Sequence, residues 1–178
     1  IESVGICGSD IHIANEQQVP EGTVFGHEFS GIIEQVGSNA AADWQVGDRV
    51  ISLGGIPCGD CPACDKGQYA KCHQIGMIGY SLQFSGAYSE YVRVSSLLSL
   101  KIPDKVDMSD AAVVEPLAVS LNAWRKVAPQ AGADVLILGG GPIGLAMVKW
   151  AKFFGAGSVV LSEMVPARIE RGREAGAD

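Results

Sequence analysis

The stretch DVLILGGGPIG, residues 134–144, joins a short apolar run to a cluster of glycines. The apolar run predicts a strand buried on both faces, and residues 143–154 predict a helix directly after it. The glycines fit G-x-G-x-x-G, a weak signal alone, but here they have the strand–turn–helix context that the motif requires. Glycines let the chain turn tightly and approach a pyrophosphate, whose charge is favoured at a helix N-terminus.

This loop therefore predicts a dinucleotide site whose members are Gly139, Gly141, Pro142, Ile143 and Gly144. Pro142 suits the first helical position, where its missing N–H is not needed. Glu163 follows 19 residues after Gly144 (163 − 144), at the end of the next predicted strand. A carboxylate there accepts from ribose hydroxyls and repels a 2′-phosphate, so NAD is expected over NADP. The alternative is that Glu163 only caps the turn before Pro166, and nearby Arg168 leaves an opening for NADP.

The surrounding sequence predicts an alternation of helices and strands. Residues 117–127 predict a helix, 158–162 a second buried strand and 166–175 a second crossover helix. Such alternation is typical of a parallel sheet with right-handed connections. Two strands and two helices cannot cover both faces of a sheet, so residues 118–178 are expected to be the truncated first part of a nucleotide-binding domain. The chain is accordingly expected to be a fragment of a longer gene product.

Residues 1–117 have a different pattern, with many glycines and short β-type runs at 29–36, 49–53 and 87–94. Short strands separated by turn formers such as Gly47-Asp48 predict a mostly β domain of barrel or partly open type. The overall fold class expected is therefore mostly β followed by α/β.

Four cysteines cluster in a predicted lobe at about residues 55–75, namely Cys58, Cys61, Cys64 and Cys72. Four thiolates complete the tetrahedral shell of a structural zinc, and two-residue spacers let the chain curl around one ion. Free or redox-active thiols are the alternative interpretation. A zinc-ribbon nucleic-acid binder is another, but the net charge of −7 argues against it.

A second group of metal-ligating residue types is spread along the chain: Cys7, His27, Glu28 and Glu115. One Cys, one His and a carboxylate make three protein ligands and leave a fourth position for water or substrate, the pattern of a catalytic zinc. Each residue alone is weak evidence. Cys7 and His27 are compatible with ordinary core positions, and Glu115 with the first turn of a helix.

Taken together, these motifs resemble the zinc-containing medium-chain dehydrogenases along essentially the whole chain. The matching segments are residues 5–12 (GICGSDIH), 26–31 (GHEFSG), 46–50 (VGDRV), 86–91 (GAYSEY), 115–117 (EPL), the four-cysteine lobe and the glycine loop. The chain looks most like the polyol branch, which holds sorbitol, butanediol and threonine dehydrogenases, because Glu115 stands where many alcohol dehydrogenases have a third cysteine ligand. The implied fold is a GroES-like catalytic domain followed by an incomplete Rossmann domain.

The resemblance also implies a role for each matching residue. Cys7 and His27 would bind the catalytic zinc, with Glu28 and Glu115 as competing carboxylate ligands, one direct and the other through water or by exchange. Ser9 would accept the substrate hydroxyl proton and pass it through the cofactor ribose and His12 to solvent. Asp10 would orient His27.

The implied function is reversible hydride transfer between a secondary alcohol or polyol and NAD, with two zinc ions per chain, by a homodimer or homotetramer. The fragment alone is expected to be inactive. The alternative is a non-catalytic nucleotide-binding or structural relative with the same fold. With 19% charged residues, a net charge of −7 and no long apolar run, neither nucleic-acid nor membrane partners are expected, and the compartment is expected to be cytoplasmic.

Overall fold

The computed structural model describes residues 1–16, 18–40 and 43–178, which form two compact units, Ile1–Glu115 and Pro116–Asp178. The change of sequence pattern had placed this boundary after residue 117. Each unit has its own sheet. No described helix has both the length and the apolar character needed to cross a membrane.

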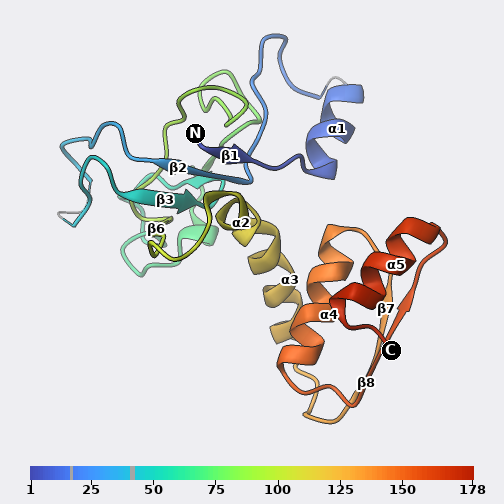
Figure 1. Cartoon of the computed structure of the whole chain (residues 1–178). Coiled ribbons are helices and arrows are strands. Elements are labelled where there is room, and N and C mark those ends of the chain that lie inside the picture. The colour runs from blue at the N-terminus through green and yellow to red at the C-terminus, as the bar shows by residue number, and fades with distance from the viewer. Residues whose placement is uncertain (17, 41–42) are drawn as a thin grey trace. The chain divides into compact units, whose positions relative to one another are not determined.

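The first unit contains a four-stranded antiparallel sheet, which Figure 1 shows with its strands labelled. In spatial order the strands are β1 (Ser3–Val4), β2 (Phe29–Ile32), β3 (Arg49–Ser52) and β6 (Ser99–Lys101). Phe29 and Val50 are almost fully buried on this sheet. Helix α2 (Met108–Ala112) packs against β1 and β2, and Asp107 caps it by accepting from the backbone N–H of Ser109 at 2.8 Å.

Two smaller features of the first unit carry the candidate metal ligands. Helix α1 (Gly8–Asn15) follows directly after Cys7, which is its N-cap residue. The two-stranded sheet of β4 (Gly55–Ile56) and β5 (Gly76–Met77) closes the base of the cysteine lobe. Between residues 58 and 74 the only regular element of the described chain is the 3₁₀ turn η1 (Tyr69–Lys71).

The strand predictions in this unit were only partly right. The strand predicted at 29–36 ends at Ile32, and the strand predicted at 87–94 is wrong, because no strand is formed there. Gly86 donates to the carbonyl of Val24, Ala87 to that of Gly26 and Tyr88 to that of Phe25. These bonds do not follow the regular register of a β-ladder, so the segment is a loop that is hydrogen-bonded to the loop at residues 24–26.

The second unit shows the predicted order of strand, helix, strand and helix. Strand β7 (Asp134–Leu138) pairs in parallel with β8 (Ser158–Ser162), and α4 (Pro142–Phe153) and α5 (Pro166–Ala175) follow them in turn. Helix α3 (Val114–Val127) begins three residues before its predicted start and leads into this unit. Pro116 is tolerated there because it lies in the first turn, where its missing N–H is not needed.

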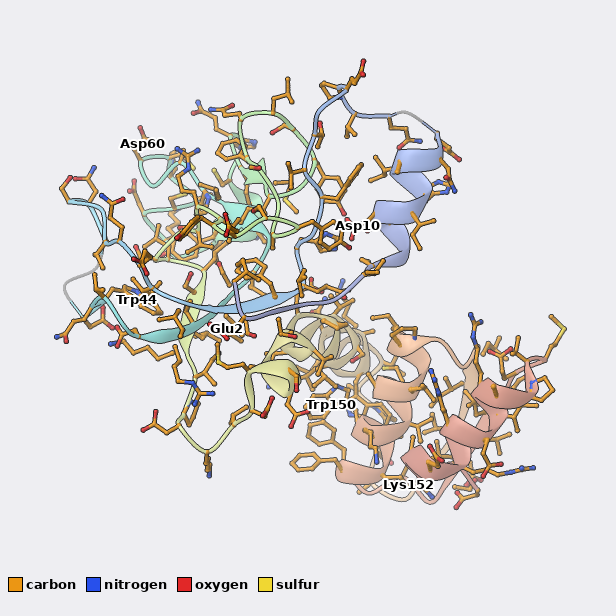
Figure 2. All side chains as sticks on the ribbon, turned by 45° about the horizontal axis from the view of Figure 1, so that its top comes forward. Glu2, Asp10, Trp44, Asp60, Trp150 and Lys152 are labelled. Carbon is orange, nitrogen blue, oxygen red and sulfur yellow. The ribbon has the colours of Figure 1, made fainter. Side chains whose placement is uncertain are left out.

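In the second unit only one face of the two-stranded sheet is covered by helices. Its core is built from Trp124, Ile137, Val148, Ala151 and Val159. The indole N–H of Trp150, whose side chain is labelled in Figure 2, donates to the Leu117 carbonyl at 3.0 Å, and this bond links α4 to α3. Leu136 and Leu138, however, are 64% and 78% exposed. The prediction that this strand is buried on both faces is therefore wrong for the described chain, because α4 and α5 cover one face only.

Candidate metal centres and nucleotide loop

The four cysteines of the lobe converge on one point. Their Sγ atoms all lie within 4.8 Å of one another. The separations are 3.5 Å for Cys58–Cys72, 3.6 Å for Cys61–Cys64 and 3.9 Å for Cys58–Cys64. Four sulfurs bound to zinc at its usual bond length stand about 3.8 Å apart at the corners of a tetrahedron. The observed spacing therefore fits a closed four-thiolate zinc site.

The protonation chemistry of the lobe also suits a metal. All five cysteines of the chain are free thiols. The backbone N–H of Cys64 lowers the pKa of Cys61 to about 6, whereas a hydrogen bond with Asp60 raises the pKa of Cys58 to about 12. Without a metal, protons are therefore held unequally among the four sulfurs, and a bound cation would replace them.

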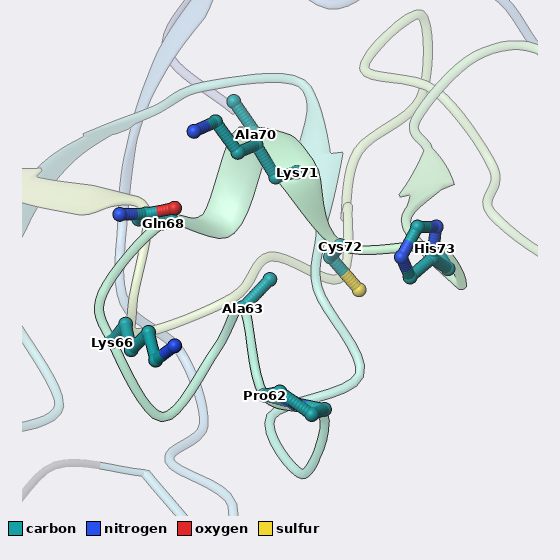
Figure 3. A pocket seen from close by; sticks show the side chains of 8 residues that line it. All are labelled: Pro62, Ala63, Lys66, Gln68, Ala70, Lys71, Cys72 and His73. Atoms are coloured by element: carbon teal, nitrogen blue, oxygen red, sulfur yellow. The ribbon is translucent and has the colours of Figure 1, made fainter.

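A shallow hollow lies on the surface of the same lobe. Figure 3 shows its lining, which consists of Pro62, Ala63, Lys66, Gln68, Ala70, Lys71, Cys72 and His73. Its lining includes neither Cys7, His27 nor Glu28, so this hollow is separate from the second metal group.

The second group brings three ligand types together from two segments. The Cys7 sulfur, a His27 ring nitrogen and a Glu28 carboxylate oxygen lie within 4.8 Å of one another. Cys7 is placed by the start of α1, while His27 and Glu28 directly precede β2. His27 is buried, and Cys7 and Glu28 are half-buried. The group is thus partly enclosed, as expected of a metal site that a small molecule reaches.

Asp10 links these ligands by hydrogen bonds. Its Oδ2 accepts from the backbone N–H of Cys7 at 3.2 Å, and its Oδ1 lies 3.2 Å from Nδ1 of His27. The carboxylate is buried, and among the described residues Oδ1 has no well-aligned hydrogen bond. Because Nδ1 of His27 faces Asp10, Nε2 is the ring nitrogen left for a metal. This is the carboxylate–histidine arrangement found behind many metal-ligating histidines.

Ser9 lies beside this group, where sequence reasoning expected the proton acceptor. Its hydroxyl donates to Cys7 Sγ at 3.2 Å and is 2.9 Å from the phenol oxygen of Tyr80. Tyr80 also packs its ring against His27, with centroids 5.4 Å apart. Burial raises the pKa of Tyr80, and the negative charges of Asp10 and Cys7 add to that shift, so the phenol stays protonated.

His12 and Glu115 lie farther out. The His12 side chain is 67% exposed at the last turn of α1 and is 3.3 Å from Glu16, so it faces solvent. Glu115 does not belong to the compact group of Cys7, His27 and Glu28. Burial raises the pKa of Glu115, the His27 charge opposes that shift and the Glu28 charge adds to it, so Glu115 is within electrostatic reach of the group.

The glycine loop has the backbone that the motif predicts. Gly139 has a φ of +97°, a left-handed conformation that favours glycine. A Cβ at Gly144 would lie 1.9 Å from the carbonyl oxygen of Gly139, so only glycine allows the helix to approach the strand end this closely. Gly141 is the N-cap of α4 and Pro142 its first residue, with Ile143 next.

The Glu163 carboxylate accepts hydrogen bonds from the protein's own backbone. The donors are the N–H groups of Gly140 at 2.7 Å, Met164 at 2.7 Å and Val165 at 2.9 Å. These bonds, chiefly the one from Val165, lower the pKa of Glu163. Arg168 stands 3.9 Å away with an exposed side chain. The capping role that the sequence left as an alternative is therefore present, and the bond to Gly140 also ties Glu163 to the nucleotide loop.

Sequence reasoning missed two tyrosines at the three-ligand group, Tyr80 and Tyr88. Tyr80 contacts Ser9 and His27, and the Tyr88 hydroxyl donates to Asp10 Oδ2 at 2.9 Å. Tyrosine is not a usual zinc ligand, and both residues stand more than 50 residues beyond His27 in sequence. Tyr88 does fall within the GAYSEY segment, which was recognised as a family motif without a role for this side chain.

Comparison with known proteins identifies relatives of this chain. Residues 1–104 match the family described as alcohol dehydrogenase GroES-like domain. The chain is 35% identical to sorbitol dehydrogenase of Bacillus subtilis over 99% of its own length and 51% of the relative's, and 38% identical to L-idonate 5-dehydrogenase of Vitis vinifera over 100% and 50%. A zinc-binding dehydrogenase structure from Sinorhizobium meliloti, bound to NADP, superposes with a TM-score of 0.87 at 36% identity, covering 99% of this chain and 51% of that one. The chain therefore spans about half the length of the relatives it matches.

Proposed function

Because the chain belongs to the zinc-type medium-chain alcohol and polyol dehydrogenase family, in the branch of sorbitol and L-idonate dehydrogenases, we propose that its protein transfers hydride between a secondary alcohol or polyol and NAD. The observation that carries the proposal is the convergence of Cys7, His27 and Glu28 within 4.8 Å. Three protein ligands leave one coordination position for substrate, as in catalytic zinc sites.

Each residue near this group has a proposed task. Cys7, His27 and Glu28 would hold the zinc, with Glu115 as the carboxylate that would exchange with Glu28. When bound, zinc supplies Lewis-acid chemistry that polarises the oxygen of the alcohol or carbonyl. Ser9 accepts the hydroxyl proton, and exposed His12 delivers it to solvent. The close contacts of Ser9 with Cys7 Sγ and the Tyr80 hydroxyl support this role, because they place its oxygen beside a metal ligand.

The proposed dinucleotide site lies in residues 118–178, which we interpret as the first part of a Rossmann domain. Gly139, Gly141, Pro142, Ile143 and Gly144 would receive the pyrophosphate at the start of α4. The lowered pKa of Glu163 keeps its carboxylate charged, which disfavours a 2′-phosphate and supports NAD. Arg168 beside it leaves NADP as the second candidate, and the relative from Sinorhizobium meliloti was solved with NADP.

The test is turnover by the intact protein that carries this chain. NAD and NADP reduction would be followed with sorbitol, L-idonate, short diols, threonine and simple alcohols, while bound zinc is counted. We expect NAD-dependent oxidation of at least one polyol with two zinc ions per chain. One zinc ion and no turnover would instead favour the non-catalytic relative with the same fold.

Ser9→Ala is the matched variant for the proton step. It should retain both zinc ions and NAD binding while kcat falls by about 10²-fold or more, the usual contribution of general acid–base catalysis. An unchanged kcat would remove Ser9 from the mechanism.

Assembly and location remain proposals as well. A homodimer or homotetramer is expected from the family resemblance, and sedimentation of the intact protein would determine it. A cytoplasmic location is expected, because closely spaced cysteines that form no disulfide suit zinc binding in a reducing compartment.

A further inference from the structure

The hydroxyl of Tyr88 touches the Cys7-bearing segment at two points. It donates to Oδ2 of Asp10 at 2.9 Å and lies 3.2 Å from the carbonyl oxygen of Gly5. Gly5 and Asp10 flank Cys7 on either side in sequence. One phenol therefore fixes both ends of the turn that presents the Cys7 sulfur.

The same tyrosine is fastened to the segment that leads into His27. Its backbone N–H donates to the Phe25 carbonyl at 2.9 Å, and the neighbouring Ala87 N–H donates to Gly26 at 2.9 Å. Its ring lies directly against Gly26, where a Cβ would come within 2.7 Å of a ring carbon. Gly26 also has a φ of +98°, so both its conformation and its lack of a side chain accommodate this ring.

Asp10 completes the link between the two ligand-bearing segments. Its Oδ2 accepts hydrogen bonds from the Tyr88 hydroxyl and the Cys7 backbone N–H, and its Oδ1 faces His27 Nδ1. We propose that Tyr88 is a positioning residue for the three-ligand zinc site, which it serves by fixing Asp10 so that His27 and Cys7 are held at metal-binding distance. Burial and the hydrogen bond to Asp10 raise the pKa of Tyr88, so its hydroxyl remains a donor at all physiological pH values.

The inference rests on the proposed function only in taking Cys7 and His27 as zinc ligands, so its test measures metal and not turnover. Tyr88→Phe keeps the ring against Gly26 and removes only the hydroxyl. In the intact protein, competition with a chelator should show zinc binding at the three-ligand site weakened about tenfold, the lower end for loss of a partner behind a metal ligand. The four-cysteine site should change less than twofold and serves as an internal control. Cobalt substitution distinguishes the two sites by their thiolate absorption.

Two further variants separate positioning from a general loss of structure. Tyr91→Phe removes a hydroxyl three residues away that has no hydrogen bond within the described chain, and it should leave both affinities unchanged. In an Asp10→Ala background, which removes the side-chain acceptor, Tyr88→Phe should have much less additional effect, because Tyr88 acts on the ligands chiefly through its hydrogen bond to Asp10. Equal weakening at both sites, the same loss in Tyr91→Phe, or full additivity with Asp10→Ala would each overturn the proposal. A protein without dehydrogenase activity that still shows the selective loss would refute the proposed function and leave this inference standing.

Discussion

Replacing one lobe cysteine, Cys61→Ser, should unfold the lobe while the rest of the first unit stays folded. Between residues 58 and 74 the only buried side chains are those of Cys64 and Cys72, which are themselves metal ligands. The segment has no apolar core of its own, and its only regular element among the described residues is η1. We therefore attribute its order to the metal.

The magnitudes support this attribution. Fixing the backbone of about 17 residues costs about 17 kcal/mol at the lower end of about 1 kcal/mol per residue. The five backbone hydrogen bonds within the segment return about 5 kcal/mol at about 1 kcal/mol each. A structural zinc supplies about 10–16 kcal/mol, which closes the difference. Losing one of four ligands removes roughly a quarter of that, or about 3 kcal/mol, which corresponds to about a hundredfold in zinc affinity.

Hydrogen exchange followed by mass spectrometry measures this directly. In Cys61→Ser at limiting zinc, peptides covering residues 58–74 should lose protection, and peptides covering β2 and β3 should keep it. Cys7→Ser is the matched control, because it removes a thiol from the other metal group and should leave lobe protection unchanged. If the lobe of Cys61→Ser stays protected after exhaustive chelation, the polypeptide alone orders it and the metal does not.

Two further predictions concern the second unit. Gly144→Ala places a Cβ 1.9 Å from the Gly139 carbonyl oxygen, so it should lower the free energy of unfolding by about 1–3 kcal/mol and weaken NAD binding. Denaturant titration measures the first effect and calorimetry the second. Unchanged values would mean that the loop relaxes without cost. Glu163→Gln should reduce the preference for NAD over NADP in binding assays, and an unaltered ratio would leave Glu163 with its capping role alone. Because the Glu163 pKa is lowered on folding, its stabilisation is present above the usual glutamate pKa and is lost as pH falls through the lowered value, so the variant should flatten the acid limb of a stability–pH curve.

The elements of the second unit were predictable because their signals are local. Strands β7 and β8 and helices α4 and α5 follow hydrophobic runs that glycine or proline interrupts, and each boundary was found within about one residue. The exposure of Leu136 and Leu138 was not predictable from the run itself, because an apolar stretch does not tell how many covering helices the chain supplies.

The first unit was harder to predict because its order depends on distant contacts. Helix α1 was not predicted, because it begins at a cysteine N-cap followed by glycine, which is a poor start signal. The run at 87–94 has strand-like composition, but its N–H groups pair with the loop before His27 in an irregular order. The candidate ligands Cys7, His27 and Glu28 were identified by residue type, whereas Tyr80 and Tyr88 required the structure.

The two metal groups differ in what holds their ligands, and that difference explains their chemistry. In the lobe the thiolates have no apolar support, so the ion must satisfy all four and no coordination position is left for another molecule. At the other group, β2, the start of α1 and the Asp10–Tyr88 bond already hold Cys7 and His27 in place. A zinc ion there need not bring its ligands together, so three of them suffice. Under the proposed function the fourth position would be left to substrate, because hydrogen bonds of the protein would perform the positioning that a fourth thiolate performs in the lobe.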